Sequence, residues 1–170
     1  MRSLPYVDPH ARRGVVYRAF ARLAGTRPMG SLSRLVAWRL DPYLLRLTGG
    51  RWGMGLFLPT ALLETRGART GQIRRNAVIY FHDGERVTIV ASKLGLHEHP
   101  AWFHNLRANP DVALGGHPFH AELVEDEPSR ERLWQLADRV FPAYAAYRER
   151  AARAGRTIPI VQLVAPLPPT

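Results

Sequence analysis

The feature that most constrains the fold is a series of three strand-like segments joined by very short turns. The segments are "TALLETR" (60–66), "QIRRNAVIYF" (72–81) and "ERVTIVAS" (85–92), and they are rich in Ile, Val, Thr and aromatic residues. The joints "GARTG" (67–71) and "HDG" (82–84) contain residues that favour hairpin turns. Parallel neighbours would need a crossover connection of about a dozen residues or more. The pattern therefore predicts antiparallel pairing and argues against a doubly wound parallel sheet.

The remainder of the C-terminal half adds helices and further strands. Pro100 begins a short helix, and Asn109–Pro110 ends it. Sequence patterns predict helices at 100–110, 129–141 and 142–154, with further strands at 111–116, 117–124 and 156–166. Ser129 is the expected start of the second helix. This order predicts an α+β fold in which mainly antiparallel strands form a small barrel with a C-terminal helix pair.

The N-terminal third has a different character. Segments 10–24 and 31–47 place apolar residues on one helical face and arginines away from it, with a kink expected at Pro42. The Gly-rich connector 48–57 matches no phosphate-binding or dinucleotide-binding motif. We expect residues 1–50 to be part of the domain or packed on it, and residues 51–170 to form the barrel domain. Basic amphipathic helices can pack on their own domain or lie on anionic lipid, and both alternatives stay open.

The net charge of +10 is concentrated in the first half of the chain. Residues 1–75 hold 14 arginines and three acidic residues, whereas residues 76–170 hold 10 basic and 11 acidic residues. This asymmetry favours an anionic partner, which is nucleic acid, a membrane surface, or a ligand with phosphate or carboxylate groups. Nucleic acid is disfavoured because the cations do not alternate with exposed aromatics along strands.

Cysteine content and hydropathy limit the class further. The absence of cysteine excludes disulfides and thiolate metal sites. No secretory signal is evident, and no segment approaches the about 18 apolar residues of a transmembrane helix. We therefore expect a cytoplasmic protein. Residues 10–47 could add peripheral contact with the inner face of the cell membrane.

Two short motifs carry the chemistry best suited to a ligand. The turn "GARTGQIRRN" combines glycines with Arg69, Thr70 and Arg74, and guanidinium groups suit phosphate. The motif "VASK" places Ser92 beside Lys93, the single lysine among 24 basic residues. A hydroxyl and an ammonium group at a strand end can hold an anion or a carbonyl. An ordinary strand end explains the motif equally well at this point.

Other candidate groups are weaker. Tyr144 and Tyr147 share a helical face, where they can pack in the core or line a pocket for a flat ligand. His97, His99 and His104 lack the spacing of a metal site, and no HExxH motif occurs. We therefore predict no metal. No nucleophile elbow is present either, which argues against a serine hydrolase.

In order and spacing, these motifs resemble those of the deazaflavin-dependent nitroreductase family, whose members are oxidoreductases that use coenzyme F420. The resemblance covers residues 44–164 and rests on "LLETRGARTGQIRRNAVIYFHDGERVTIVASK", "HPAWFHNLRANP" and "FPAYAAYRERAARAGRTIPIV". It implies a split β-barrel, like that of FMN-binding proteins, with the reduced deazaflavin in a groove. It also implies hydride transfer from the deazaflavin to an acceptor.

The resemblance also implies which residues contact the coenzyme. The turn would hold the phosphate and the anionic tail, the second strand would run beside the ring, and "ASK" and the helix start would complete the site. Ser92, Tyr144 and Tyr147 are the candidates for orienting or protonating the acceptor. The implied cofactor-binding residues are Ala68, Arg69, Thr70, Arg74, Arg75, Asn76, Ala77, Val78, Ile79, Ala91, Ser92, Lys93, Ala101, Trp102, Phe103, His104, Asn105 and Tyr147.

The chain departs from the family pattern at several of these places. Ala68 stands where a second basic residue is usual, and Leu94 stands where Gly is common. Ile73 and Ala77 occupy positions that are often proline, and Ile79 occupies a position that is Tyr in some active members. Tyr80 is adjacent to Ile79 but is expected to face the opposite side of the strand. Activity on nitro compounds is therefore the property least safely carried over.

The resulting expectation is an F420-dependent reductase that acts on a small conjugated acceptor such as a quinone, an enone or a nitro compound. The alternative is a non-catalytic split-barrel carrier of deazaflavin or FMN, with FMN the less favoured ligand. The sequence leaves the choice between monomer and homodimer open.

Overall fold

The computed structural model describes residues 4–15, 17, 21 and 58–166. Seven of the fifteen residues of the expected helix at 10–24, and all of the expected helix at 31–47, lie outside the described residues. The connector 48–57 and the domain boundary after residue 50 also lie outside them. Residues 10–14 are described and are not helical, whereas residues 15, 17 and 21 are helical. The expected start of the first helix at residue 10 is therefore wrong. Within the described residues, no helix is long and apolar enough to cross a membrane.

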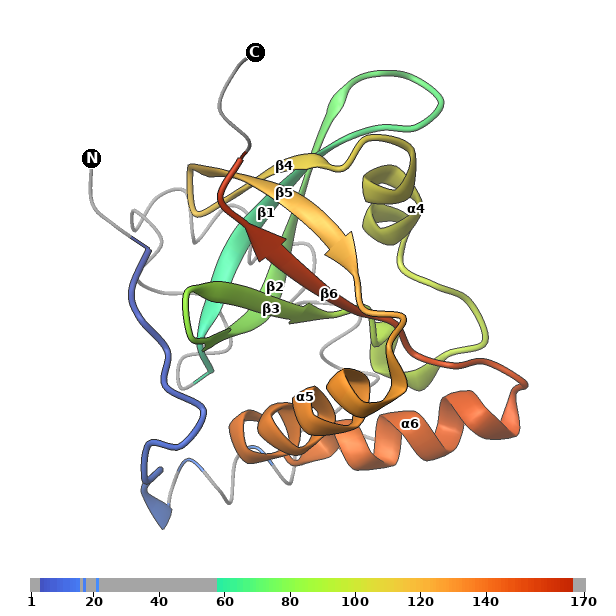
Figure 1. Cartoon of the computed structure of the whole chain (residues 1–170). Coiled ribbons are helices and arrows are strands. Elements are labelled where there is room, and N and C mark those ends of the chain that lie inside the picture. Colours follow the sequence, from blue (N-terminus) through green and yellow to red (C-terminus); the bar gives the residue numbers. More distant parts are fainter. Residues whose placement is uncertain (1–3, 16, 18–20, 22–57, 167–170) are drawn as a thin grey trace.

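Six antiparallel strands close into a barrel in the order β1-β2-β3-β6-β5-β4 (Figure 1). This confirms the α+β barrel expected from the sequence. The strands are β1 (Thr60–Arg66), β2 (Ile73–Asp83), β3 (Arg86–Val90), β4 (Asp111–Leu114), β5 (His117–Leu123) and β6 (Ile160–Val164). Within residues 58–166, the helices are the short 3-10 helix η1 (Lys93–Gly95), α4 (Ala101–Ala108), α5 (Glu127–Val140) and α6 (Ala143–Arg153).

Several predicted boundaries need correction. β2 extends to Asp83 rather than to residue 81, α4 ends at Ala108 rather than at residue 110, and β4 ends at Leu114 rather than at residue 116. β3 ends at Val90 rather than at residue 92, because the next residues turn into η1. β6 begins at Ile160 rather than at residue 156. α5 begins before Ser129, since the Asp126 carboxylate caps the helix by accepting a hydrogen bond of 2.9 Å from the Ser129 amide.

The long strand β2 joins the two sides of the barrel. Its residues from Ile73 to Ile79 pair with β1, and those from Tyr80 to Asp83 pair with β3. Because side chains alternate along a strand, Tyr80 packs in the barrel interior while Ile79 packs toward α5 and α6. The expected opposite orientation of Ile79 and Tyr80 is confirmed.

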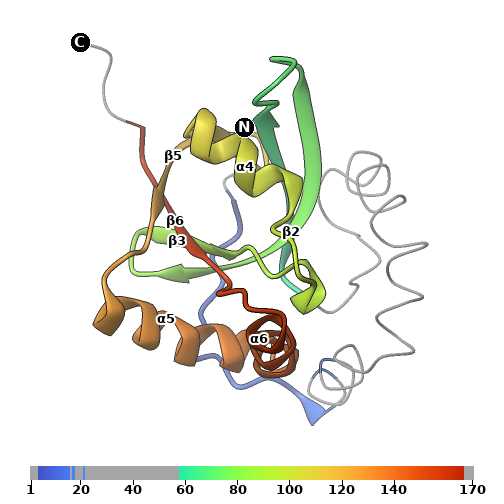
Figure 2. The same cartoon turned by 90° about the vertical axis from the view of Figure 1, so that its right-hand side faces the viewer.

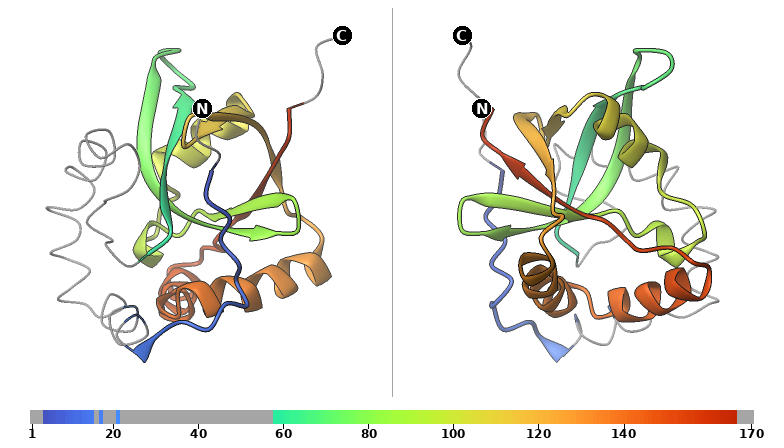
Figure 3. Two further views of the ribbon diagram at one scale, coloured as in Figure 1. Left: turned by 90° about the vertical axis from the view of Figure 1, so that its left-hand side faces the viewer. Right: turned by 45° about the vertical axis from the view of Figure 1, so that its right-hand side comes forward.

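Two hydrophobic cores result. The barrel core fills the interior of the barrel and includes Leu63, Ile89, Leu114 and Leu163. The helix core lies between the barrel and the C-terminal helices. It includes Phe81, Leu133, Val140, Tyr144, Tyr147 and Ile158. Figures 2 and 3 show α5 and α6 crossing one end of the barrel, while α4 lies at the other end beside the β1–β2 hairpin. The candidate site lies at the α4 end of the barrel, away from α5 and α6.

An N-terminal segment, residues 4–8, packs along the barrel. The Val7 carbonyl accepts a hydrogen bond of 2.9 Å from the His82 amide, and the Val7 amide donates to His82 Nδ1 over 3.0 Å. The Tyr80 hydroxyl donates to the Pro5 carbonyl over 2.9 Å, and burial raises the pKa of Tyr80 to about 12. Tyr80 is therefore a structural group that anchors this segment.

Candidate functional site

The turn between β1 and β2 is tight because glycine occupies both of its ends. The Gly67 amide donates to the Gln72 carbonyl over 2.8 Å, and the Gly71 amide donates to the Gly67 carbonyl over 2.8 Å. Gly71 has a positive φ of 66°, which glycine adopts without strain. A Cβ at Gly67 would lie 3.0 Å from Thr70 Oγ1. The sequence therefore fixes a compact turn that presents Ala68, Arg69 and Thr70 to solvent.

Asn105 fixes this turn to α4. Its Oδ1 accepts a hydrogen bond of 3.1 Å from the Ala68 amide, and its Nδ2 donates to Thr65 Oγ1 over 3.1 Å. Thr65 is buried, so losing this contact would leave a buried hydroxyl without its donor. The family resemblance placed Asn105 against the coenzyme. The structure shows a further role, which is to hold the turn beside the helix.

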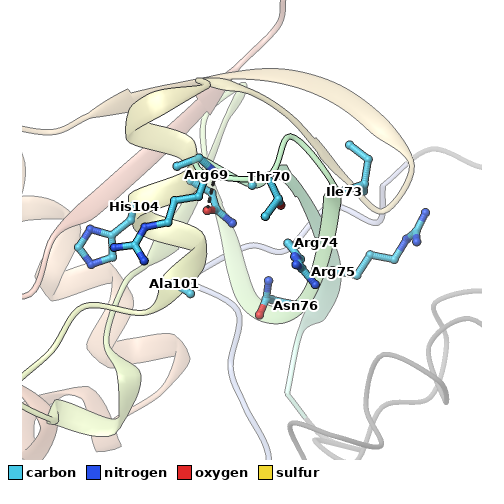
Figure 4. Close-up of a pocket in the computed structure, with 11 residues that line it drawn as sticks. Arg69, Thr70, Ile73, Arg74, Arg75, Asn76, Ala101 and His104 are labelled. Carbon is cyan, nitrogen blue, oxygen red and sulfur yellow. Dashed lines mark hydrogen bonds between the residues drawn. The ribbon is translucent and has the colours of Figure 1, made fainter.

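A cavity of about 870 Å³ lies between the turn, the first half of β2 and α4 (Figure 4). Its volume lies within the range of ligand-binding clefts, about 300–1,000 Å³. Nine of the eighteen predicted cofactor-binding residues line it, and Gly67 and Ile73 complete the lining. The nine are Ala68, Arg69, Thr70, Arg74, Arg75, Asn76, Ala101, His104 and Asn105.

The arginines of this cavity differ in their partners. Arg75 pairs with Glu64, with 2.7 Å between Nε and Oε1, and Figure 4 shows its side chain directed away from α4. Within the described part of the chain, Arg69 and Arg74 form no hydrogen bond or ion pair. In Figure 4 the Arg69 side chain extends toward α4, on the side where His104 lies. Arg69 and Arg74 are therefore the cations available to an anionic ligand.

Ser92 and Lys93 lie outside the cavity, in the loop of residues 91–98 that follows β3 and contains η1. Lys93 and Leu94 have positive φ values of 44° and 58°, an uncommon conformation for residues other than glycine. The Lys93 ammonium group donates to a Glu98 carboxylate oxygen over 2.7 Å and to the His99 carbonyl over 3.3 Å. The hydrogen bond from Lys93 is the main reason that the pKa of Glu98 is lowered.

The same loop is anchored to α6 through Gly95. Gly95 has a φ of 74°, and a Cβ there would lie 2.5 Å from the Tyr147 carbonyl oxygen. Only glycine permits so close an approach. The loop conformation that carries Lys93 therefore depends on α6 as well as on β3.

The other nine predicted residues do not line the cavity. Four belong to the barrel core, namely Val78, Ala91, Trp102 and Phe103. Ala77, Ile79, Ser92 and Lys93 are partly exposed. Tyr147, like the candidate catalytic Tyr144, is buried in the helix core with 2–3% exposure. Burial raises the pKa of both phenols, and Arg150 partly opposes the shift at Tyr147. Contact with the coenzyme stays a prediction for all eighteen residues.

Four residues of the cavity and of the loop after β3 were not among the predicted site residues. Gly67 and Ile73 line the cavity, and both lie within the motif already singled out. Glu98 and Arg156 hold the Lys93 loop, Glu98 through Lys93 and Arg156 through backbone carbonyls. No sequence pattern links Arg156 to Ser92, because 64 positions separate them.

Comparisons with known proteins identify the family. A family model described as F420H(2)-dependent quinone reductase matches residues 37–165. An F420H(2)-dependent quinone reductase of Mycobacterium tuberculosis is 38% identical over 133 residues, which are 74% of this chain and 87% of that protein. A second M. tuberculosis protein, described as a putative F420H(2)-dependent quinone reductase, is 36% identical over 110 residues, which are 62% of this chain and 89% of that protein.

Solved structures agree with this assignment. An F420-H2-dependent reductase has 33% sequence identity and a TM-score of 0.53, over 62% of this chain and 93% of that chain. A chain described as a domain-swapped dimer has 30% identity and a TM-score of 0.56, over 73% of this chain and 96% of that chain. The protein belongs to the F420H(2)-dependent quinone reductase family.

Proposed function

We propose that the cavity between the β1–β2 turn and α4 holds the anionic part of coenzyme F420 and that the protein reduces a quinone. Family membership makes the chain an F420-dependent oxidoreductase. The observation that carries the placement is the convergence of Arg69, Arg74 and Thr70 with the start of α4 around one cavity. When bound, reduced F420 supplies the hydride.

The residues present suit a phosphodiester and a carboxylate tail. Guanidinium groups bind such oxyanions through two parallel hydrogen bonds, and Arg69 and Arg74 have these donors available within the described structure. A hydrogen bond to a charged group contributes about 1.5–3 kcal/mol. The Thr70 hydroxyl is a further donor to the ligand. Binding loses little conformational entropy of the turn, because Asn105 already holds the turn against α4.

The proton for the reduced acceptor needs a group that solvent or substrate can reach. Ser92 is partly exposed, whereas Tyr144 and Tyr147 are buried in the helix core. This difference favours Ser92 among the three candidates. Reduction of a quinone to a hydroquinone takes up one hydride and one proton. The Ser92 hydroxyl would orient the quinone carbonyl oxygen by donating a hydrogen bond to it, and the proton would come from solvent. Enones and nitro compounds are alternative acceptors with the same requirement.

The membrane contact of residues 10–47 and a location in the cytoplasm also stay proposals. The membrane contact rests on the basic amphipathic pattern of that segment alone. Binding to vesicles with and without anionic lipid would test the membrane contact. Loss of binding after neutral lipid replaces the anionic lipid is the expected result.

A fluorescence titration with F420, and in parallel with FMN, tests the proposed site. Wild type should bind F420 in preference to FMN, and high salt should weaken the binding because phosphate contacts are electrostatic. Lys93→Ala should also weaken F420 binding, whereas Arg132→Ala, far from the cavity, should not. Absence of F420 binding, or a preference for FMN, would contradict the proposal.

Turnover separates the enzyme from the carrier alternative. With reduced F420 and menadione as the quinone, the enzyme oxidises the coenzyme at a rate that depends on menadione. A carrier would bind F420 equally well and leave its oxidation rate unchanged on addition of menadione. The second result would remove the reductase assignment while leaving the binding site in place.

A further inference from the structure

Arg156 is a buried cation with an unusual set of partners. It follows α6, and its amide donates to the Ala151 carbonyl over 2.8 Å at the end of that helix. Its side chain then crosses to the loop after β3. Nη2 donates to the Ser92 carbonyl over 2.6 Å and to the Ala91 carbonyl over 3.2 Å, and Nη1 donates to the Glu98 carbonyl. Arg156 is only 8% exposed.

These contacts close the loop that carries Lys93. The three carbonyls belong to residues 91, 92 and 98, which are the two ends of the loop, and Lys93 lies between them. The planar guanidinium group can bond both ends at once, which an ammonium group cannot do in the same geometry. Burying this charge among carbonyls costs solvation free energy, and burial lowers the pKa of Arg156. The contacts must therefore offset that cost.

The loop has a second, independent anchor. Gly95 packs against the Tyr147 carbonyl of α6, and this contact involves no part of Arg156. Loss of the guanidinium group would therefore free the segment at Ser92 and Lys93 while the centre of the loop stays docked. The backbone strain at Lys93 and Leu94, both with positive φ, would favour relaxation of that segment.

We propose that Arg156 is a positioning residue that sets the orientation of Ser92 and Lys93 toward the coenzyme. This inference rests on the proposed contact of Ser92 and Lys93 with F420. Arg156 acts through the backbone of the loop and makes no contact with the ligand itself. Its contribution is to hold the Lys93 ammonium group and the Ser92 hydroxyl in one arrangement before the coenzyme binds.

A double-mutant cycle tests this inference. F420 dissociation constants are measured by fluorescence for Lys93→Ala, Arg156→Gln, Arg156→Lys and the pair Lys93→Ala with Arg156→Gln. Thermal unfolding identifies a temperature at which every variant is folded. Arg132→Gln is the control, because it also removes a hydrogen-bonded guanidinium group, and that group pairs with Asp83 and makes no contact with the loop.

We expect Arg156→Gln and Lys93→Ala each to weaken binding about tenfold, and the pair to weaken it by clearly less than the hundredfold of additive losses, because Arg156 acts partly through Lys93. Arg156→Lys should fail to restore affinity although it keeps the charge. Arg132→Gln should leave affinity unchanged. If Arg156→Gln does not fold, Arg156→Lys replaces it in the cycle with the same expectation.

The outcomes separate the two claims. Additive losses, an unchanged affinity in Arg156→Gln, or full affinity in Arg156→Lys would overturn the positioning role while leaving the proposed site intact. An unchanged affinity in Lys93→Ala would contradict the Lys93 contact itself and would overturn the inference together with it.

Discussion

The two halves of β2 use charged residues in opposite ways. In the first half, Arg74 is exposed at the cavity and has no partner within the described structure. In the second half, Asp83 is tied to Arg132 by two hydrogen bonds of 2.7 and 2.8 Å and to Gln162 by one of 3.1 Å. Arg74 is thus available to a ligand, although its neighbour Arg75 pairs with Glu64. The charges at the second end instead hold α5 to the barrel.

This contrast teaches that arginine content alone does not locate a binding site. Whether an arginine can bind a ligand depends on whether it already pairs with an acidic residue. The partner of Arg132, Asp83, lies 49 positions away in the sequence. The exposed end of β2 extends beyond its pairing with β3, which begins at Tyr80, so a ligand can approach there. Changes at each end should therefore separate ligand affinity from stability.

The largest effect is expected from removing both available cations. Arg69→Ala with Arg74→Ala should weaken F420 binding at least about a hundredfold, since each of the two lost charged hydrogen bonds contributes about 1.5–3 kcal/mol. The salt dependence of the remaining binding should fall, while the free energy of unfolding should stay within about 0.5 kcal/mol of wild type. Titrations at two salt concentrations and thermal unfolding measure both quantities. The control is the double variant Arg130→Ala with Arg153→Ala on the C-terminal helices. An equal loss of F420 affinity in this control would contradict the assignment of Arg69 and Arg74 to coenzyme binding.

A smaller, mixed effect is expected at Asn105, because it links the turn to the helix. Asn105→Ala removes the hydrogen bonds to the Ala68 amide and to Thr65 Oγ1. Stability should fall by about 1–2 kcal/mol, since the buried Thr65 hydroxyl loses its donor. F420 affinity should fall as well, because the turn is no longer fixed. Asn109→Ala, at the end of the same helix, is the matched control and should change affinity little. Unchanged stability in Asn105→Ala would show that the bridge is absent in solution.

At the second end of β2, stability should change without a change in affinity. Asp83→Asn weakens the pair with Arg132 and should cost about 1 kcal/mol at pH 7. The hydrogen bond from Arg132 is the main cause that lowers the pKa of Asp83 below its ordinary 3.8. The stabilisation is therefore present above that value and is lost as the pH falls through the lower folded-state pKa.

Chemical denaturation from pH 7 down to pH 3 measures this difference. The gap between wild type and Asp83→Asn should shrink below about pH 3.8. Glu149→Gln, which disturbs an exposed pair at 3.7 Å, should show no gap at any pH. A constant gap across the range would contradict the role of the Asp83 carboxylate.

The smallest effect is expected from Gly67→Ala. The new methyl group would lie 3.0 Å from Thr70 Oγ1 and 3.2 Å from the Gln72 carbonyl oxygen, so the turn must shift by a few tenths of an ångström. We expect F420 affinity to fall a few-fold and stability to change by less than about 0.5 kcal/mol. An affinity equal to wild type would show that the turn tolerates this shift.

The sequence predicts local features of this molecule well, because they depend on local patterns. Apolar alternation and short turns identify β1, β2 and β3, and Pro and Asn-Pro delimit α4. The turn motif with Arg69 and Arg74 contains eight of the eleven residues that line the cavity. Boundaries are less well predicted, since Asp126 rather than Ser129 caps α5.

Long-range relations are not readable in the same way. Trp102 and Phe103 lie within a predicted binding segment, yet the helix turns both into the barrel core. Tyr144 and Tyr147 share one face as predicted, and that face packs in the helix core. Arg156 reaches Ser92 only because α6 returns to the end of β3. Such contacts depend on tertiary packing, which no periodicity or spacing encodes.

Hydrogen–deuterium exchange of the full chain with and without F420 tests the central claim most directly, because it locates the ligand on the protein. Coenzyme binding should slow exchange in segments 67–76 and 101–105, which contain the residues that line the cavity, and leave α5 and the β2–β3 turn unchanged. Protection confined to α5, or no protection at residues 67–76 at saturating F420, would contradict the placement of the coenzyme.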